Sequence, residues 1–286
     1  MKAWLKLLRL HHCVKNFLVF APLFFHGRFF DTRLLLTALA GWFAFTCWAS
    51  AVYVLNDCLD ARRDRLHPVK RFRPIASGAV SRRSACCLLV GLLLAGCAAL
   101  WPVAAPGRAL AWGALYVGLN VAYSFGWKHI PVLDVAILAC GFLIRVMFGS
   151  AITGIAVSHW LYLTVLTGAC YLGLGKRRNE LRRLKGARTR RVLRFYTAEF
   201  LDRNMYLCLG LAISFYALWS VAQGREQLVW TVPLVLLILM KYNLSIERES
   251  DGDPVEVFLH DPALIFLGIA YAGLLLLLLY TPWGAV

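Results

Sequence analysis

Long apolar segments alternate with short polar ones along nearly the whole of this 286-residue chain. A run of about 18 or more apolar residues indicates a helix that crosses a membrane, because the apolar core of a bilayer is roughly 30 Å thick. The clearest run, from Leu34 to Leu55, carries no Lys, Arg, Asp or Glu. The pattern predicts an all-α polytopic membrane protein of about nine transmembrane helices. They lie near residues 14–30, 33–56, 84–103, 109–126, 131–152, 159–175, 204–222, 228–246 and 263–280.

Basic residues are distributed unevenly among the polar segments. Alternate segments hold most of the 31 Lys and Arg residues, namely 1–16, 57–83, 127–130, 176–203 and 247–262. The loops on the other side hold only Arg28, Arg33, Arg108 and Arg225. Because Lys and Arg accumulate in cytoplasmic loops, we expect the N-terminus and the longer polar segments in the cytoplasm, with the helices in a bacterial inner membrane. The same distribution accounts for much of the net charge of +16, which therefore does not indicate a nucleic-acid partner.

Composition supports a single membrane domain. Hydrophobic residues make up 60% of the chain and the mean hydropathy is +0.65, values too apolar for a soluble domain of this size. The nine cysteines are scattered and form no CxxC pair, so we interpret them as small apolar fillers in a reduced protein. Trp and Leu alternate with Lys and Arg near the start. We expect one domain over residues 1–286, with an interfacial helix at 1–13.

Oxygen-bearing side chains recur where the second predicted helix ends. Asn56, Asp60 and Asp64 are spaced by four residues, which places them on one slowly drifting helical face, and Asp57 meets Asp60 at i+3. Carboxylates stacked in this way repel one another unless a cation lies among them, and hard oxygen ligands suit Mg²⁺. Basic residues that suit a polyphosphate follow at once. These are Arg62, Arg63, Arg65, Lys70, Arg71 and Arg73. The segment therefore predicts a Mg²⁺–diphosphate site at a membrane surface.

The segments Asn56–Asp64 and Lys70–Gly78 resemble the first aspartate-rich signature of the UbiA superfamily of intramembrane prenyltransferases. Members of this superfamily are all-helical, nine-span, Mg²⁺-dependent enzymes that act on isoprenoid phosphates. The resemblance covers nearly the whole chain. It implies a UbiA-type helical bundle with a central cavity open to the cytoplasmic side, and active-site loops at 57–83 and 176–203.

The second of these loops departs from the usual pattern of the superfamily. Aromatic-acceptor prenyltransferases carry a second aspartate-rich motif there, whereas this chain has Glu180 among Lys176, Arg177 and Arg178. The departure resembles the decaprenyl-phosphate phosphoribosyltransferase branch. Further segments that resemble this branch are Val14–Asn16 before Ala21 and Pro22, Tyr123–Gly126 with Lys128 and His129, Leu133–Asp134, and Gly141–Arg145.

The resemblance to this branch implies transfer of phosphoribose from phosphoribosyl diphosphate to a polyprenyl phosphate, such as decaprenyl phosphate, with release of pyrophosphate. It implies that Mg²⁺ is held by Asn56, Asp57, Asp60 and Asp64, and that the three aspartates and Lys176 are catalytic. Substrate contacts are implied for a larger set: Lys15, Asn16, Asn56, Lys70, Arg71, Arg73, Tyr123, Lys128, Asp134, Arg145, Arg177 and Glu180. The lipid bilayer is the other expected partner. The expected product serves an arabinofuranosyl lipid donor for cell-envelope glycans.

Several assignments stay open at the level of sequence. Arg145 either bounds a substrate pocket or pairs with an acid on another helix, and Lys128 either reaches a phosphate or anchors the membrane edge. The sequence does not divide the basic residues between lipid phosphate and sugar 5-phosphate, and it sets neither the prenyl length nor whether a homo-oligomer forms. A group of acids after residue 250 also has an open role, with turn chemistry as the simpler interpretation. These acids are Asp251, Asp253, Glu256 and Asp261.

Two other functions compete with phosphoribosyl transfer. A prenyltransferase that uses an aromatic or haem acceptor would require a second carboxylate cluster in residues 176–203. A membrane transporter or lipid-binding scaffold would not require acids at metal-ligand spacing on one helical face. Product analysis with Mg²⁺ separates these three possibilities.

Overall fold

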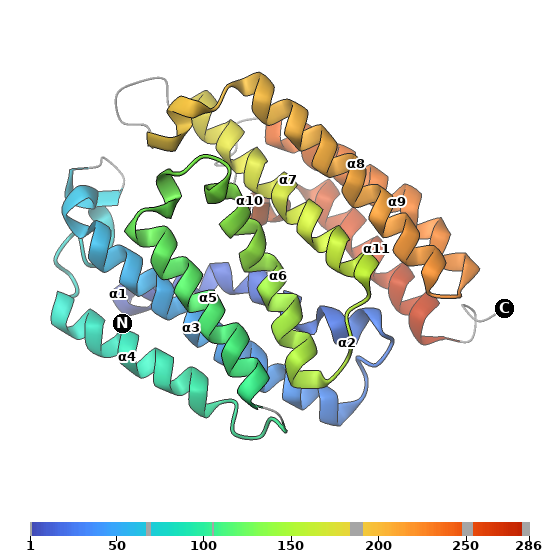
Figure 1. Ribbon diagram of the computed structural model, residues 1–286, viewed down its shortest axis with the longest axis horizontal. Coiled ribbons are helices and arrows are strands. Elements are labelled where there is room, and N and C mark those ends of the chain that lie inside the picture. Colours follow the sequence, from blue (N-terminus) through green and yellow to red (C-terminus); the bar gives the residue numbers. More distant parts are fainter. Residues whose placement is uncertain (1, 67–69, 105, 184–190, 248–253, 282–286) are drawn as a thin grey trace. The chain divides into compact units, whose positions relative to one another are not determined.

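The structure is a computed structural model that describes residues 2–66, 70–104, 106–183, 191–247 and 254–281 (Figure 1). Over these residues the chain forms helices and turns and contains no β-strand. The α-helices and 3₁₀ segments are, in chain order, α1 (Lys2–Leu8), η1 (Leu10–Phe20), α2 (Ala21–Phe25), α3 (Thr32–Arg65), η2 (Lys70–Phe72), α4 (Arg82–Ala98), α5 (Pro106–Phe125), η3 (Trp127–His129), α6 (Leu133–Thr153), α7 (His159–Arg183), η4 (Arg191–Phe195), α8 (Ala198–Ala222), η5 (Glu226–Thr231), α9 (Val232–Glu247), α10 (Pro254–His260) and α11 (Pro262–Tyr280).

Five helical segments of the described chain are long and apolar enough to cross a membrane. They are Thr32–Arg65, Leu133–Thr153, Ala198–Ala222, Glu226–Glu247 and Pro262–Tyr280. The chain is therefore an all-helical integral membrane protein, as its hydropathy predicts. The helices α4, α5 and α7 occupy three other predicted spans without meeting the same criteria of length and composition. The count of nine spans and the central cavity stay predictions.

Contacts among the helices divide the chain into two compact units. Unit 1 comprises Met1–Phe24, Arg28–Trp127 and Ile144–Ile155, and unit 2 comprises Phe25–Gly27, Lys128–Leu143 and Ala156–Val286. The helix α6 contributes its first half to unit 2 and its second half to unit 1. Within unit 1, α4 packs along α3, and within unit 2, α8 packs along α7 (Figure 1).

Trp48 explains how three helices of unit 1 approach one another. It lies on α3, is buried, and its indole N–H donates to the carbonyl of Leu93 at 3.4 Å. A Cβ at Gly96 of α4 would lie 2.4 Å from the Trp48 ring, and one at Gly113 of α5 would lie 2.2 Å from it. Small residues of this kind let membrane helices pack closely. The two glycines therefore provide the space that the indole fills.

The first predicted span is wrong in its form. We expected one helix over 14–30, but a 3₁₀ segment, Leu10–Phe20, is followed by the short α-helix Ala21–Phe25. Gly27 then turns the chain with a φ of +74°. Pro22 accounts for part of the break, because proline lacks an N–H and is accommodated in the first turn of a helix. The predicted interfacial helix over 1–13 is also shorter, since α1 ends at Leu8.

Two helices extend further than predicted. The helix α3 continues to Arg65 and α7 continues to Arg183. The acidic segment after residue 56 is therefore helical, as the spacing of its acids predicts, although the second predicted span ends at residue 56. The basic segment after residue 176 also begins as helical turns, where we had expected a loop. In α3 no Gly or Pro stands where the apolar run ends, and α7 continues through Gly175 into residues with good helix propensity, among them Lys176, Arg177, Arg178, Glu180 and Leu181. Side chains on these turns consequently have fixed directions.

Candidate active site

The aspartate cluster of unit 1 comprises Asp57, Asp60 and Asp64 on the last turns of α3, with Arg9 and Arg73. The Nη2 atom of Arg9 donates to Asp57 Oδ1 at 2.6 Å. The Nη1 atom of Arg73 lies 2.7 Å from Asp64 Oδ2 and 3.3 Å from Asp57 Oδ1. Asp57 and Asp64 are buried, whereas Asp60 is partly exposed and lies 3.9 Å from Arg63.

The shared arginine joins a pair of acids that the sequence analysis did not single out, Asp57 and Asp64. Helical geometry explains this pairing, because residues seven apart differ by only about 20° around the helix, whereas residues eight apart differ by about 80°. The expected grouping of Asn56, Asp60 and Asp64 on one face stays a prediction. Asn56 accepts a hydrogen bond from Ser124 of α5 at 3.4 Å.

A small apolar core places both arginines of the aspartate cluster. Leu7 of α1, Ile75 and Val80 are buried against Val54 and Ala61 of α3. Arg9 comes two residues after Leu7, and Arg73 comes two residues before Ile75. Burial of these apolar side chains thus fixes the segments that present the two guanidinium groups.

The loop that carries Arg73 is closed by its own backbone. The amide of Ser77 donates to the carbonyl of Arg73 at 2.9 Å, and the amide of Val80 donates to the carbonyl of Pro74 at 3.0 Å. Gly78 has a φ of +82°, a conformation that a side chain would strain. Arg65 also donates to the carbonyl of Ala76 at 3.1 Å, which ties the loop to the end of α3.

Arg9 occupies a strained backbone position. Its φ of 51° and ψ of 49° are left-handed, a conformation that costs a non-glycine residue about 1–2 kcal/mol. The hydroxyl of Ser50 donates to the carbonyl of Leu8 at 3.1 Å, and the Arg9 guanidinium lies 5.1 Å from the centre of the Tyr53 ring. The fold therefore holds Arg9 against α3 from both its backbone and its side chain.

The donor set of the aspartate cluster fits a hard divalent cation. Asn56, Asp60 and Asp64 supply amide and carboxylate oxygens, which Mg²⁺ prefers. In the part of the chain that the structure describes, however, no three His, Cys, Asp or Glu side chains are grouped closely enough to hold a metal ion. The contact of Arg73 with Asp64 occupies one of these carboxylates. The residues fit such an ion chemically, and side chains must reorient to bind it.

The other predicted substrate contacts of unit 1 differ in how exposed their side chains are. Lys70 is half-buried on η2, and Arg71 is exposed with its guanidinium 4.8 Å from the centre of the exposed Phe72 ring. Tyr123 is half-buried in the last turn of α5, next to the Ser124 that contacts Asn56. Lys15 is half-buried on η1.

Arg145 lies in a buried polar network of unit 1. Its Nε donates to Asn16 Oδ1 at 2.8 Å, and its Nη2 donates to the Tyr116 hydroxyl at 3.2 Å. The guanidinium also lies 5.0 Å from the centres of the Phe45 and Tyr116 rings, which favours a desolvated cation. Asn16 donates in turn to Thr46 at 3.0 Å. These contacts join η1 to α3, α5 and α6. The predicted substrate contacts of Asn16 and Arg145 stay predictions.

The Arg177 cluster of unit 2 comprises Asp134, Arg177, Glu180 and Tyr196. Arg177 is fully buried, with its Nε 2.5 Å from Asp134 Oδ2 and its Nη1 2.8 Å from Glu180 Oε2. The Tyr196 hydroxyl donates to Asp134 Oδ1 at 2.6 Å and accepts from the amide of Val132 at 2.6 Å. Burial and the hydrogen bond to Asp134 raise the pKa of Tyr196 to about 12, so the phenol stays protonated at neutral pH.

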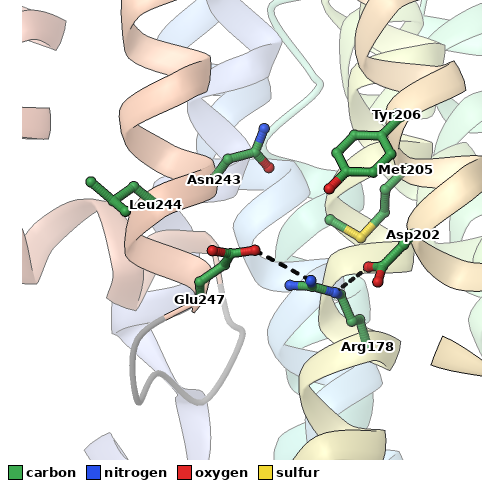
Figure 2. A pocket seen from close by; sticks show the side chains of 7 residues that line it. All are labelled: Arg178, Asp202, Met205, Tyr206, Asn243, Leu244 and Glu247. Atoms are coloured by element: carbon green, nitrogen blue, oxygen red, sulfur yellow. Dashed lines mark hydrogen bonds and ion pairs between the residues drawn. The ribbon is translucent and has the colours of Figure 1, made fainter. Parts of the chain in front are cut away.

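Arg178 joins three helices of unit 2. Figure 2 shows its guanidinium between the carboxylates of Asp202 on α8 and Glu247 on α9. Asp202 forms an ion pair with Arg178, and Glu247 lies 3.4 Å from it. The pocket beside them is lined by Arg178, Asp202, Met205, Tyr206, Asn243, Leu244 and Glu247. Arg178 is itself buried and acts as a clamp between α7, α8 and α9.

These contacts change the charge balance expected at the end of α7. The sequence places one carboxylate, Glu180, among three basic residues, but folding adds Asp134, Asp202 and Glu247. Arg177 and Arg178 are thus engaged by four carboxylates. Whether Arg177 neutralises a substrate phosphate stays a prediction. Lys176 follows Gly175 on the same turn and is half-buried, as is Lys128 on η3.

The acids after residue 250 fall into two groups. Asp251 and Asp253 lie outside the described residues, and the side chain of Glu256 is not described either. Asp261 caps α11, accepting from the amides of Ala263 and Leu264 at 3.0 and 3.4 Å. The hydrogen bond from Lys241 holds the pKa of Asp261 well below its usual range. Asp261 therefore has a structural role at a helix end.

Four residues of these clusters were missed by the sequence analysis: Arg9, Tyr196, Asp202 and Glu247. Each lies far along the chain from its partner, so spacing carries no signal. Only Arg9 had a weak signal in the sequence, since it is a basic residue in the amphipathic segment expected at the membrane surface.

Comparisons with known proteins identify the family of this chain. The model of the UbiA prenyltransferase family matches residues 17–270. The decaprenyl-phosphate phosphoribosyltransferase of Corynebacterium glutamicum is 33% identical to this chain, covering 96% of it and 86% of the relative. Its namesake from Mycobacterium tuberculosis is 32% identical and covers 93% and 90% of the two chains. A solved UbiA homolog from Archaeoglobus fulgidus, bound to GPP and Mg²⁺, shares the fold with a TM-score of 0.73 at 21% identity, over 96% of each chain. The chain belongs to the UbiA prenyltransferase family and is a transferase.

Proposed function

We propose that this enzyme transfers the 5-phosphoribosyl group of phosphoribosyl diphosphate to a polyprenyl phosphate, with release of pyrophosphate, in a Mg²⁺-dependent reaction. The observation that carries the proposal is the contrast between two helix ends. The helix α3 ends with three aspartates, whereas α7 ends with Lys176, Arg177 and Arg178 and one carboxylate, Glu180. Relatives that match 96% and 93% of this chain carry the name of this activity.

The aspartate cluster is proposed to receive the sugar diphosphate. The oxygen ligands are proposed to come from among Asn56, Asp57, Asp60 and Asp64, and a bound Mg²⁺ would neutralise charge on the departing pyrophosphate. Arg73 already lies at this cluster, 2.7 Å from Asp64, and a guanidinium can donate two parallel hydrogen bonds to a phosphate. Lys70 and Arg71 follow the same helix and are proposed to donate to the sugar phosphates.

The acceptor phosphate is proposed to bind at basic side chains outside the aspartate cluster. Lys176 is the first choice, because it is a half-buried cation on the polar end of α7. Lys15 and Lys128 are further candidates, since each is half-buried, Lys15 within η1 and Lys128 on η3. The remaining substrate contacts proposed are Asn16, Tyr123, Asp134, Arg145, Arg177 and Glu180.

The proposed reaction is a displacement at the anomeric carbon of the ribose. A phosphate oxygen of the lipid forms the new bond to this carbon, and the bond from carbon to the diphosphate oxygen breaks, with the electron pair leaving on pyrophosphate. Attack from the opposite face inverts the configuration. The nucleophile is already an anion at neutral pH, so no general base is required. The side chains contribute by positioning both substrates and by stabilising negative charge.

The proposed location is the cytoplasmic face of a bacterial inner membrane. The excess of Lys and Arg in alternate segments supports this orientation. The product is proposed to feed an arabinofuranosyl lipid donor for cell-envelope glycans.

Product analysis in detergent tests the function. The purified enzyme with Mg²⁺, phosphoribosyl diphosphate and decaprenyl phosphate should yield pyrophosphate and a phosphoribosylated lipid, identified by mass spectrometry. The matched reaction supplies a prenyl diphosphate and an aromatic acceptor. If only the matched reaction gives product, the enzyme is a prenyltransferase and the proposal is wrong.

A further inference from the structure

Asp57 has different surroundings from the other acids of the aspartate cluster. Its side chain is 2% exposed, and its Oδ1 atom lies 2.6 Å from Arg9 and 3.3 Å from Arg73. The Asp60 side chain is 22% exposed. A metal ligand must present an oxygen to an incoming ion, whereas Asp57 presents Oδ1 to two guanidinium groups. Asp57 therefore resembles an arginine acceptor more than a metal ligand.

Arg73 bridges two carboxylates with one nitrogen. Its Nη1 atom is 2.7 Å from Asp64 and 3.3 Å from Asp57. A guanidinium in this position relieves the repulsion between the acids, which is also what a metal ion would do. Arg73 consequently competes with a metal ion for Asp64. Its side chain is 24% exposed, so it has solvent beside it into which it can turn.

Arg9 is fixed by the fold. Leu7 is buried beneath it, Ser50 binds the carbonyl of Leu8, and the guanidinium packs over the ring of Tyr53. The left-handed backbone of Arg9 is retained in spite of its cost. Arg9 thus shares the charge of Asp57 from a fixed position and limits how strongly Asp57 can hold Arg73.

We propose that Arg9 and Asp57 form a positioning pair for Arg73, and that Asp57 does not ligate the metal. Without donor, Arg73 bridges Asp57 and Asp64. When a metal-bound diphosphate binds, Arg73 releases Asp64 and donates to the diphosphate from beside Asp57. The metal is left to Asn56, Asp60 and Asp64. The identity of the diphosphate rests on the proposed function, whereas the metal ligands and the competition do not.

Binding of Mn²⁺ to the purified protein without donor, followed by electron paramagnetic resonance, tests the competition. Removing a competing cation should tighten binding, so Arg73→Gln and Arg9→Gln should each lower the Mn²⁺ dissociation constant, by about fivefold for Arg73→Gln. Loss of a ligand should do the opposite, and Asp60→Asn should raise the constant by about tenfold or more. Damage to the fold would also weaken binding, so the expected sign separates competition from disruption.

The charge-balanced double variant Arg9→Gln/Asp57→Asn tests the assignment of Asp57. It removes one charge of each sign, so the Mn²⁺ dissociation constant should stay within about threefold of wild type. A loss of binding equal to that of Asp60→Asn would show that Asp57 is a ligand and overturn the proposal. Weakened or unchanged Mn²⁺ binding in Arg73→Gln, or no saturable binding in either wild type or Arg73→Gln, would overturn it equally. Thermal unfolding of every variant identifies any that is misfolded. If the double variant is misfolded, the Mn²⁺ dissociation constant of Arg73→Gln alone decides whether the proposal holds.

Donor kinetics give the second measurement. Arg9→Gln should raise the KM for phosphoribosyl diphosphate by about tenfold while kcat changes less than about threefold, since the lost positioning acts on donor binding. Arg9→Lys should restore part of the KM. A fall in kcat with unchanged KM would contradict the positioning role. If phosphoribosyl diphosphate is not a substrate, the proposed function fails while the Mn²⁺ measurements still decide the assignment of Asp57.

Discussion

The two charged clusters of this enzyme contain the same kinds of side chain in different settings. In the aspartate cluster, the side chains of Arg9 and Arg73 are 19% and 24% exposed. The end of α3 carries three aspartates, which outnumber these two arginines. In the Arg177 cluster, Arg177 and Asp134 are both fully buried. Exposure determines which ion pairs can exchange partners, because a partly hydrated cation loses little when it leaves a carboxylate. The ion pairs of the aspartate cluster are therefore suited to rearranging when a ligand binds, whereas those of the Arg177 cluster hold their helices in place whether or not a ligand is bound.

The comparison is tested most strongly by removing two acids of the aspartate cluster. The double variant Asp60→Ala/Asp64→Ala should lose at least about a thousandfold in activity, equivalent to about 4 kcal/mol of barrier, because it removes both carboxylates proposed to ligate the metal and leaves only the neutral oxygen of Asn56. Product formation in detergent at saturating Mg²⁺ measures this. Full activity of the folded double variant would show that the aspartates do not hold the diphosphate.

Removing the central charge of the Arg177 cluster should chiefly destabilise the protein. Arg177→Met leaves the buried Asp134 without its ion pair, which should lower the free energy of unfolding by about 3 kcal/mol. Chemical denaturation in detergent measures the change. In a double-mutant cycle, Arg177→Met/Asp134→Asn should cost less than the sum of the single variants. Additive costs would mean that the two side chains do not interact as the structure indicates.

The hydroxyl of Tyr196 should contribute a smaller amount. Tyr196→Phe removes the hydrogen bonds with Asp134 and with the amide of Val132, and should lower the free energy of unfolding by about 1–2 kcal/mol. Tyr206→Phe on α8 is a matched control, because that ring is exposed. Equal effects of the two substitutions would contradict the buried network.

The smallest losses of unfolding free energy are expected for substitutions of two other arginines of unit 2. Arg178→Met removes the clamp between Asp202 and Glu247 and should cost about 1 kcal/mol of unfolding free energy, since both acids are partly exposed. Arg203→Met breaks an exposed pair with Glu199 and should cost less than about 0.5 kcal/mol. Denaturation curves of the two variants decide the order, and a larger cost for Arg203→Met would contradict it.

Much of the fold could be predicted from hydropathy, because long apolar runs have few alternatives to membrane helices. The segments 109–126 and 263–280, for example, correspond closely to α5 and α11. The form of the first segment could not be predicted in the same way. Its 3₁₀ geometry depends on packing of Phe20 and Leu23 against α3 and Ile155, and hydropathy contains no information about such contacts.

In the candidate site, contacts between residues close in sequence could be predicted, and contacts between distant residues could not. The aspartates and Arg73 are close in sequence, so motif and spacing predicted their association. Arg9 contacts Asp57 across 48 residues, and Tyr196 contacts Asp134 across 62. Such pairs form only when helices pack, and a single sequence does not state which helices are neighbours. The charge balance of Arg177 and Arg178 could not be predicted for the same reason.

The central claim is that the aspartate cluster holds the diphosphate of the sugar and not that of a lipid. Isothermal titration of the purified enzyme with phosphoribosyl diphosphate and with decaprenyl phosphate, each in Mg²⁺, tests it most directly. In Asp60→Ala/Asp64→Ala, affinity for phosphoribosyl diphosphate should fall at least about a hundredfold, whereas affinity for decaprenyl phosphate should stay within about threefold. Wild-type enzyme that binds a prenyl diphosphate through these aspartates and does not bind phosphoribosyl diphosphate would contradict the account.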